Sequence, residues 1–358
     1  MADWKVKPLG EVCTLQRGFD LPTQDRRPGG YPLISSSGVI DTHDEGRVLG
    51  PGVVTGRSGS IGNVFYVAED FWPLNTTLYV RDFHESDPRF VYYLLTAFDL
   101  RRYAGGTGVP TLNRNDVHSV AVQVPSSVEE QRRIVAILDE AFECIATAKA
   151  NAEKNLHNAR ELYRNHVKSV FMRAAEDWPT RTLDQISMNL DSRRVPVTKS
   201  DRKAGEFPYY GASGIVDYVA DYIFEGEALL VSEDGANLLA RSTPIAFPAS
   251  GRYWVNNHAH ILKFDQMATQ QFVEFFLESI PLDVYITGAA QPKLNQRALN
   301  SIPIPIPDSV NAQVVVVDLL ERVAEQTERL RTTYERKLAA LGELKRSLLH
   351  QAFSGRLS

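Results

Sequence analysis

The feature that most constrains how this chain can fold is an internal repeat that runs through its 358 residues. Ser-Gly-Val-Ile-Asp at 37–41 returns as Ser-Gly-Ile-Val-Asp at 213–217, at an offset of 176. Later in each half the offset becomes 182 and holds, so that Leu-Asn at 112–113 matches Leu-Asn at 294–295. A constant offset over many positions predicts two copies of one folding unit, and the changes of offset mark loop insertions.

Each half changes composition once, at a proline. Residues 1–126 are rich in Gly, Pro, Ser, Thr and aromatic residues, and short apolar runs at 64–67 and 77–80 lie between turn residues, which is typical of strands. One helical segment at 88–95 interrupts them and has a counterpart at 271–277. Each half therefore begins with a mixed α/β globule.

A long helix is expected to follow each globule. Residues 126–176 contain neither proline nor glycine, and their apolar residues recur at helical spacing. Ser126 or Ser127 can cap this helix, and its counterpart starts at Ser309. A helix of about 50 residues is about 75 Å long, so a second helix that pairs with it must run back, as an antiparallel coiled coil. We assign to coiled-coil packing and partner docking Gln131, Ile134, Leu138, Phe142, Tyr163, Leu320, Leu330, Tyr334, Leu348 and Phe353.

The predicted fold class is α/β, with two mixed α/β domains that are related by a pseudo-two-fold axis and separated by a long antiparallel two-helix coiled coil. Two related globules held apart by stiff helices suit the reading of two short sites on one DNA duplex. The expected segments are a first domain at 1–126, a central long helix at 127–176, a second domain at 177–308 and a C-terminal long helix at 309–358.

Composition excludes several classes of protein. Cys13 and Cys144 are the two cysteines and lie far apart, so neither a disulfide framework nor a thiolate metal site is expected, and a reducing compartment fits. The N-terminus lacks an apolar signal core, and no stretch approaches the roughly 18 apolar residues of a membrane span. We therefore expect a cytoplasmic protein without a membrane partner. The net charge of −5 argues against indiscriminate polyanion binding, although a local basic face stays possible.

The starts of both long helices carry a family resemblance. These are Val-Pro-Ser-Ser-Val-Glu-Glu-Gln-Arg-Arg-Ile at 124–134 and Ile-Pro-Ile-Pro-Asp-Ser-Val-Asn-Ala-Gln at 304–313, and the C-terminal run Leu-Leu-His-Gln-Ala-Phe-Ser-Gly-Arg-Leu at 348–357 is equally typical. Over essentially its whole length the chain resembles a specificity subunit of a type I restriction-modification system, which serves in defence against foreign DNA.

The resemblance implies a function and a set of partners. Each of two target-recognition domains would read one half of a bipartite sequence in double-stranded DNA. The helical regions would set the spacing and bind two methyltransferase subunits, and through them restriction subunits. S-adenosylmethionine and adenine methylation would belong to the methyltransferase partner, so that no cofactor is expected in this chain.

The residues themselves give no sign of catalysis. Methyl transfer to a base amine would need an Asn-Pro-Pro or Asp-Pro-Pro segment, and neither occurs. The glycine-rich stretch 56–62 lacks the Gly-Lys-Ser/Thr of a phosphate-binding loop. His258 and His260 lie at i, i+2 on an expected strand, with both rings on one face, but no third metal ligand is evident. We therefore predict a non-catalytic chain without a metal site.

Four loops are candidates for DNA contact. Residues 56–62 and 232–237 are either plain turns between strands or DNA-facing loops, in which arginine can read guanine, a carboxylate can accept from cytosine N4 and asparagine can pair with adenine. Residues 105–115 and 288–297 combine glycines with amide and basic side chains, whereas Asn113 and Asn295, which both halves keep, are expected to cap the following segment. The predicted DNA-binding residues are Arg57, Ser58, Ser60, Thr107, Arg114, Asn115, Glu233, Asp234, Asn237, Lys293, Gln296 and Arg297.

The alternative is a coiled-coil scaffold that joins two protein partners and has no sequence-specific DNA role. Diverged loops on a repeated scaffold favour DNA recognition, whereas negative potential on the shared face of both globules would favour the scaffold.

Overall fold

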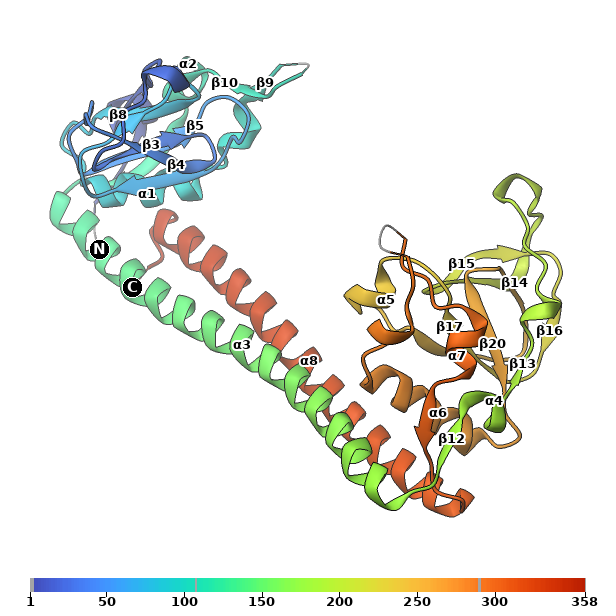
Figure 1. Cartoon of the computed structure of the whole chain (residues 1–358). Coiled ribbons are helices and arrows are strands. Elements are labelled where there is room, and N and C mark those ends of the chain that lie inside the picture. Colours follow the sequence, from blue (N-terminus) through green and yellow to red (C-terminus); the bar gives the residue numbers. More distant parts are fainter. Residues whose placement is uncertain (1–2, 107, 289–290, 358) are drawn as a thin grey trace. The chain divides into compact units, whose positions relative to one another are not determined.

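A computed structural model describes residues 3–106, 108–288 and 291–357, and within α3 it leaves the side chains of 174–176 undescribed (Figure 1). The chain divides into two compact units. Unit 1 comprises Met1–Glu153 with Arg336–Ser358, and unit 2 comprises Lys154–Glu335. Each unit thus combines one globular domain with part of each long helix. No helix in the described part of the chain is long and apolar enough to cross a membrane.

The globular part of unit 1 is built on two sheets. A four-stranded antiparallel sheet has the order β2-β8-β5-β6, a three-stranded sheet has the order β4-β3-β7, and β1-β11 and β9-β10 form separate pairs. The elements are β1 Trp4–Pro8, η1 Leu9–Glu11, β2 Thr14–Arg17, η2 Thr23–Asp25, β3 Tyr31–Ser35, β4 Gly38–His43, β5 Gly52–Gly56, β6 Val64–Val67, β7 Trp72–Pro73, β8 Thr77–Asp82, α1 Pro88–Ala97, η3 Leu100–Tyr103, β9 Ala104–Gly105, β10 Thr111–Leu112, α2 Arg114–His118 and β11 Ala121–Pro125.

Unit 2 repeats this plan. Its four-stranded antiparallel sheet has the order β13-β20-β17-β18, a second sheet has the order β15-β14-β19-β16, and β12 pairs with β21. The elements are β12 Thr180–Thr182, α4 Leu183–Ile186, β13 Met188–Asn189, η4 Asp191–Arg193, η5 Lys199–Asp201, β14 Ala204–Gly211, β15 Gly214–Val219, β16 Phe224–Glu225, β17 Ala228–Ser232, α5 Asn237–Ala240, β18 Ala246–Ala249, β19 Arg252–Val255, β20 Ala259–Lys263, α6 Met267–Ser279, η6 Asp283–Tyr285, α7 Gln296–Asn300 and β21 Pro303–Pro305.

The predicted two-fold repetition of a mixed α/β unit is therefore confirmed by the strand order. The helix between the late strands is also present twice, as α1 and α6. Asp87 caps α1 by accepting hydrogen bonds from the Arg89 and Phe90 backbone N–H groups, and Pro88 occupies the first helical position, where its missing N–H has no cost. The buried face of α1, which includes Phe90 and Leu94, packs on the sheet of its own unit.

The two long helices are α3, Val128–Asp177, and α8, Val310–Phe353, and both can be followed in Figure 1. In unit 1 the first part of α3 shares a core with the last part of α8, and in unit 2 the last part of α3 shares a core with the first part of α8, so the pairing is antiparallel. The buried residues Leu138, Ile145, Ala152 and Ala159 recur every seven positions, which is the repeat of a coiled coil. The predicted coiled coil is confirmed.

Several helix residues that were assigned to coiled-coil packing and partner docking pack inside their own unit. Ile134, Leu138 and Leu320 are almost completely buried, and Gln131 accepts a hydrogen bond from Asp87 N at 2.9 Å. These side chains hold each helix against the globule of its own unit, so they are not free to contact a partner. Phe142 packs edge-on against Tyr93 of α1 and Phe353 packs at a tilt against Phe90, each with ring centroids 5.4 Å apart, while Tyr163, Tyr334 and Leu348 are half-buried.

Leu330 was expected on the apolar stripe, but it is 44% exposed. The heptad positions that follow buried Leu320 on α8 are Thr327 and Tyr334, both half-buried, and Leu330 lies three residues after Thr327, on the neighbouring part of the same face, where it stays exposed. A polar residue therefore occupies this part of the seam, which periodicity of apolar residues alone could not reveal.

Candidate nucleic-acid interface

Two loops in each unit are joined by backbone hydrogen bonds, and we call them the paired loops. In unit 1 they are residues 57–60, after β5, and residues 108–112, before α2. Gly59 N donates to the Pro110 carbonyl at 3.2 Å, and Leu112 N donates to the Arg57 carbonyl at 2.8 Å. Glycine is required at 59 because its φ is 85°.

Unit 2 has the same connections between residues 233–236 and 291–294. Gly235 N donates to the Pro292 carbonyl at 3.1 Å, and Leu294 N donates to the Glu233 carbonyl at 2.8 Å. Gly235 again has a positive φ, of 106°. The offsets are the 176 and 182 of the sequence repeat, so the two units keep one backbone arrangement.

The side chains on this common backbone differ between the units. Arg57 corresponds to Glu233, Ser58 to Asp234, and Thr111 to Lys293, and the last two positions face each other across a β-bridge in each unit. A fixed backbone that carries different donors and acceptors is what the recognition of two different base sequences requires.

The predicted DNA-binding residues of unit 1 lie on or beside its paired loops. Arg57 is half-buried and donates from Nη1 to the Asn75 carbonyl at 3.1 Å, which fixes its guanidinium. Ser58 is half-buried and Ser60 is exposed. The remaining predicted residues are Arg114 and Asn115, which are exposed at the start of α2, and Thr107, which lies outside the described residues.

The asparagines that both halves of the chain retain have the capping role that the sequence predicted. Asn113 accepts from Asn115 N at 3.1 Å as the N-cap of α2, and Asn295 accepts from Ala298 N at 2.9 Å as the N-cap of α7. The preceding Leu112 and Leu294 are buried. The Leu-Asn pairs therefore anchor the ends of the paired loops.

Glu233 is only 8% exposed, which contradicts its predicted role in reading cytosine. Its carboxylate pairs with Arg194 Nη1 at 2.5 Å and with Lys293 Nζ at 3.0 Å. Burial raises the pKa of this carboxyl, but the hydrogen bonds from Arg194 and Lys293 lower it by more, so the pKa lies below its ordinary value. Glu233 is thus an internal ion-pair partner that holds Lys293.

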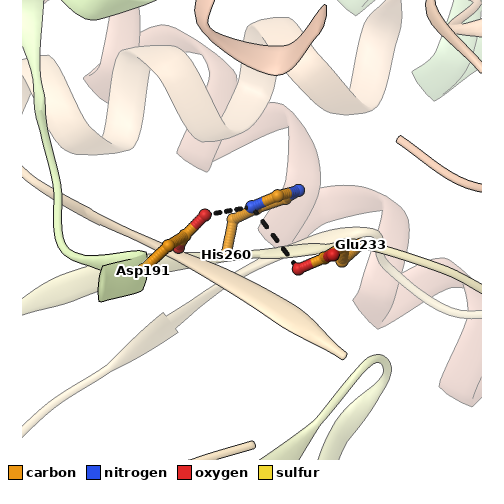
Figure 2. Close-up of side chains that lie close together, drawn as sticks. All are labelled: Asp191, Glu233 and His260. Carbon is orange, nitrogen blue, oxygen red and sulfur yellow. Dashed lines mark hydrogen bonds and ion pairs between the residues drawn. The ribbon is translucent and has the colours of Figure 1, made fainter. Parts of the chain in front are cut away.

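His260 continues this network, and Figure 2 shows its ring between the carboxylates of Asp191 and Glu233. It is fully buried on β20, with Nδ1 at 2.5 Å from Asp191 Oδ2 and Nε2 at 2.7 Å from the Leu294 carbonyl, and its ring also lies 3.8 Å from Glu233. Asp191 also accepts from Ile261 N at 2.9 Å. The histidine therefore connects η4, β20 and the second paired loop. We call Asp191, Arg194, Glu233, His260 and Lys293 the buried charge cluster.

The pKa of the Asp191 carboxyl is also below its ordinary value. Burial raises this pKa, whereas the hydrogen bond and charge of His260, the N–H of Ile261 and the charge of Arg194 together lower it by more. Asp191 and Glu233 are therefore ionised in the folded unit, and each has a basic side chain as its partner.

The donor atoms of Asp191, Glu233 and His260 are close enough together to hold a metal ion. However, Arg194 lies 3.6 Å from Asp191 and 2.5 Å from Glu233, and Lys293 also pairs with Glu233. A cation would have to compete with two side-chain cations that already neutralise these carboxylates. The donor set therefore fits an internal ion-pair network better than a metal site.

His258 does not lie on the strand that the sequence predicted. It lies in the turn before β20, and its Nδ1 is 2.9 Å from both carboxylate oxygens of Asp234. The rings of His258 and His260 thus bind two separate carboxylates instead of converging on one site. Asp234, at 15% side-chain exposure, is the neighbour of Glu233 that remains at the rim of the cluster.

Asn237 also proves to have an internal role. Its Nδ2 donates to the Thr243 carbonyl at 2.9 Å, and its Oδ1 accepts from Ser242 Oγ and from Thr243 N. These bonds brace the turn, so they argue against the predicted pairing of this amide with adenine. Gln296 is exposed and donates to Asn189 Oδ1 at 2.8 Å, and Arg297 is exposed.

Asp191 and Arg194 were not among the residues predicted from the sequence. They lie in and just after η4, far along the chain from Glu233 and His260. The repeat contained a signal for them. At the offset of 174, which relates Trp4 to Trp178, Asp191 aligns with Arg17 and Arg194 aligns with Asp20, so the charge is reversed at both positions.

The junction between globule and long helix also differs between the units. In unit 1, Arg89 donates from Nε and Nη2 to one oxygen of Asp139, at 3.1 and 2.9 Å, and the Tyr93 hydroxyl donates to the same oxygen. At the equivalent positions of unit 2, Gln271 donates to Glu321 at 3.0 Å. The arginine–carboxylate ion pair of unit 1 is thus replaced in unit 2 by a hydrogen bond between a neutral amide and a carboxylate.

Glu274 on α6 lies at this weaker junction. Burial raises its pKa to about 7, and the neighbouring charges of Glu278 on α6 and Glu321 on α8 act in the same direction. The same two α6 carboxylates raise the pKa of Tyr163 on α3, whose own burial is the larger cause.

We predict that Glu274→Gln stabilises unit 2 by about 1–2 kcal/mol above pH 7, after allowance for partial solvent screening. An acid with a raised folded pKa destabilises the fold progressively as pH rises from its ordinary value to the raised one, so the gain should be complete above pH 7 and absent at pH 4. Hydrogen exchange of the full-length chain at both pH values measures it. The matched control is Glu325→Gln, an exposed partner of Arg329, and an equal gain at both pH values would refute the assignment.

Comparison with known proteins gives three kinds of match. The family model for the type I restriction modification DNA specificity domain matches residues 1–156 and 175–338. A Haemophilus influenzae protein described as a type I restriction enzyme specificity subunit is 34% identical over 147 residues, which are 41% of this chain and 37% of the relative. The specificity subunit of the Escherichia coli type I restriction enzyme EcoprrI is 25% identical over 170 residues, 44% of this chain and 42% of the relative. These alignments thus span about two fifths of each curated relative.

Solved structures share the fold at low identity. One, from a study of complex assembly and conformational transition in the type I restriction-modification system, has a TM-score of 0.81 and 16% identity, and covers 99% of this chain and 98% of its own. The HsdS subunit from Thermoanaerobacter tengcongensis has a TM-score of 0.63 and 18% identity, and covers 99% and 97%.

Proposed function

The chain belongs to the type I restriction-modification DNA specificity family, and from this premise we propose that it is the DNA-recognition subunit of a restriction-modification complex. Each unit reads one half of a bipartite target in double-stranded DNA. The observation that carries this proposal is the pair of identically connected loops, which present different side chains on one backbone. A scaffold that only joins two proteins would not need this pattern of retained backbone and changed polar groups.

The DNA contacts are assigned to groups on the paired loops and on the short helices that follow. Basic and amide side chains supply both phosphate contacts and bidentate contacts to base edges. In unit 1 these are Arg57, Ser58, Ser60, Arg114 and Asn115, and in unit 2 they are Asp234, Lys293, Gln296 and Arg297, with Thr107 kept as a prediction from the sequence.

Catalysis is assigned to the partners of this chain. Two methyltransferase subunits dock on the exposed faces of α3 and α8, bind S-adenosylmethionine and methylate adenine, and restriction subunits join through them. The present chain supplies recognition and no cofactor. The buried residues of the two long helices pack on the globules of this chain. The solvent-facing positions of these helices are therefore available for docking.

The test is a comparison of adenine methylation in two host strains. Both carry the neighbouring methyltransferase, and one lacks only this chain. Long-read detection of modified adenines should find one split motif that is methylated only when the chain is present. Unchanged methylation with an active methyltransferase would refute the proposal and leave the scaffold alternative, whose partners a pull-down would identify.

A further inference from the structure

Three positions in and next to the paired loops carry opposite charges in the two units. Unit 2 has Asp191, Arg194 and Glu233. Unit 1 has Arg17 and Asp20 at the offset of 174, and Arg57 at the offset of 176. The inversion is complete, acid for base at all three positions, so the charges at this place are reversed between the two units.

The unit 1 network is open to solvent. Arg17 donates to Asp20 at 3.0 Å, with side-chain exposures of 50% and 62%, and Asn75 donates to the same Asp20 oxygen at 2.5 Å. Leu78 of β8 stands where unit 2 has His260 of β20, at the offset of 182. Among the described residues the Arg57 guanidinium donates to the Asn75 carbonyl, and Leu78 gives unit 1 no histidine at the position of His260.

The unit 2 network is buried and holds Glu233 rigidly. Arg194 binds its carboxylate and also donates to the Ala259 carbonyl at 2.8 Å, so the guanidinium is fixed to β20. The backbone of Glu233 is fixed too, since its N–H donates to the His258 carbonyl and its carbonyl accepts from Leu294 N. Glu233 is therefore held through both its backbone and its carboxylate.

Lys293 is the exposed end of this network. Its side chain is half exposed, and its ammonium lies 3.0 Å from Glu233 Oε1. Among the described residues Glu233 engages one of the three ammonium N–H donors, and the other two can serve an external acceptor. A free lysine side chain loses up to about 2 kcal/mol of rotamer entropy when it is fixed, and here that ordering occurs before any ligand arrives.

We propose that Glu233 is a positioning residue for base recognition by unit 2, and that it acts by holding the Lys293 ammonium toward one base edge of the half-site. The inference rests on the proposed DNA-recognition function. Lysine reads guanine through O6 and N7 in the major groove. An ammonium that is fixed toward a base edge can discriminate among base pairs, whereas a mobile one can pair with any nearby phosphate, which carries no sequence information. In unit 1 the equivalent Arg57 makes this contact directly.

The test uses the full chain in complex with its methyltransferase. Methylation mapping of the host genome first gives the split motif of the wild-type complex. Binding is then measured on duplexes that carry this motif and on duplexes with each base pair of either half-site replaced. The variants are Glu233→Gln, Lys293→Gln and the double variant, with Glu225→Gln as the control, because Glu225 is an exposed acid of unit 2 that is paired with Arg252.

Glu233→Gln should reduce discrimination at one base pair of one half-site by roughly tenfold, the size of one lost direct contact, and leave the other half-site unchanged. Lys293→Gln should relax the same base pair, and the double variant should add nothing further. Glu225→Gln should relax no position. A general loss of structure would instead weaken binding to the whole half-site.

Three results would overturn the proposal: unchanged discrimination in both single variants, relaxation at different base pairs, or full additivity in the double variant. If Glu233→Gln does not fold, Lys293→Gln decides alone, because its half-exposed side chain can change without loss of the core. Absence of any split motif in the wild-type complex would refute the proposed function itself, and is thus a separate outcome.

Discussion

Replacement of Arg194 by methionine is expected to reduce the stability of unit 2 by about 3–5 kcal/mol at pH 7. The guanidinium is 14% exposed and compensates two buried carboxylates, Asp191 and Glu233. Methionine has a similar length but leaves both carboxylates without this partner. Removal of one member of a buried ion pair costs far more free energy than the intact pair contributes to stability, because an uncompensated charge stays buried. Hydrogen exchange of the β17 and β20 amides in the full-length chain measures the loss, with unit 1 as internal reference.

The control for this substitution is Arg252→Met, in the same unit. Arg252 is 52% exposed and pairs with Glu225 on the surface, so its loss should cost less than about 1 kcal/mol. A loss below 1 kcal/mol in Arg194→Met as well would show that the cluster does not stabilise unit 2.

The loss in Arg194→Met should also depend on pH. Because the folded pKa values of Asp191 and Glu233 are below their ordinary values, their contribution to stability is complete above the ordinary values and is lost as pH falls through the lowered ones. The difference between wild type and Arg194→Met should therefore narrow in acid. A difference that stays constant down to pH 2 would place the role of Arg194 in packing and not in charge compensation.

The fold was largely predictable because its signals are periodic or repeated. The sequence offset predicted two like units, and the strand orders confirm it. The run without glycine or proline predicted α3, and the retained Leu-Asn pairs predicted the caps of α2 and α7. These inferences need only local spacing or comparison of the chain with itself.

The buried charge cluster was not predictable in the same way. Glu233 contacts a residue 39 positions earlier, and His260 contacts one 69 positions earlier. A single sequence states which residues are charged but not which of them are buried together. The sequence therefore placed Glu233 and Asn237 among the DNA-reading residues, although neither side chain is free for that role.

The long helices show a related limit. The spacing of apolar residues predicts that one face of a helix is buried, but it does not say by what. Leu138 was assigned to the coiled-coil seam and to partner docking. In the structure it is completely buried, in one cluster with Leu94 of α1 and Leu349 of α8. The globule of unit 1 thus covers a position that the pattern alone left open to a partner.

This difference gives the second large prediction. Leu138→Ala should destabilise unit 1 by about 2–5 kcal/mol, because it removes a fully enclosed side chain and leaves a cavity. The measurement is hydrogen exchange of β5 and β8 in the full-length chain, with unit 2 as internal reference. Leu344→Ala, at a position of α8 in the same unit that is 47% exposed, is the matched control and should change stability by less than about 1 kcal/mol.

The two roles considered for Leu138 lead to opposite results in this experiment. If Leu138 packs on its own globule, its substitution lowers the hydrogen-exchange protection of unit 1 in the isolated chain. Any loss of methyltransferase binding then follows from that instability. A partner contact would leave the protection of the isolated chain unchanged and weaken assembly alone. Because Leu138 has no exposed surface and shares its core with α1, unit 1 should lose protection before any partner is added.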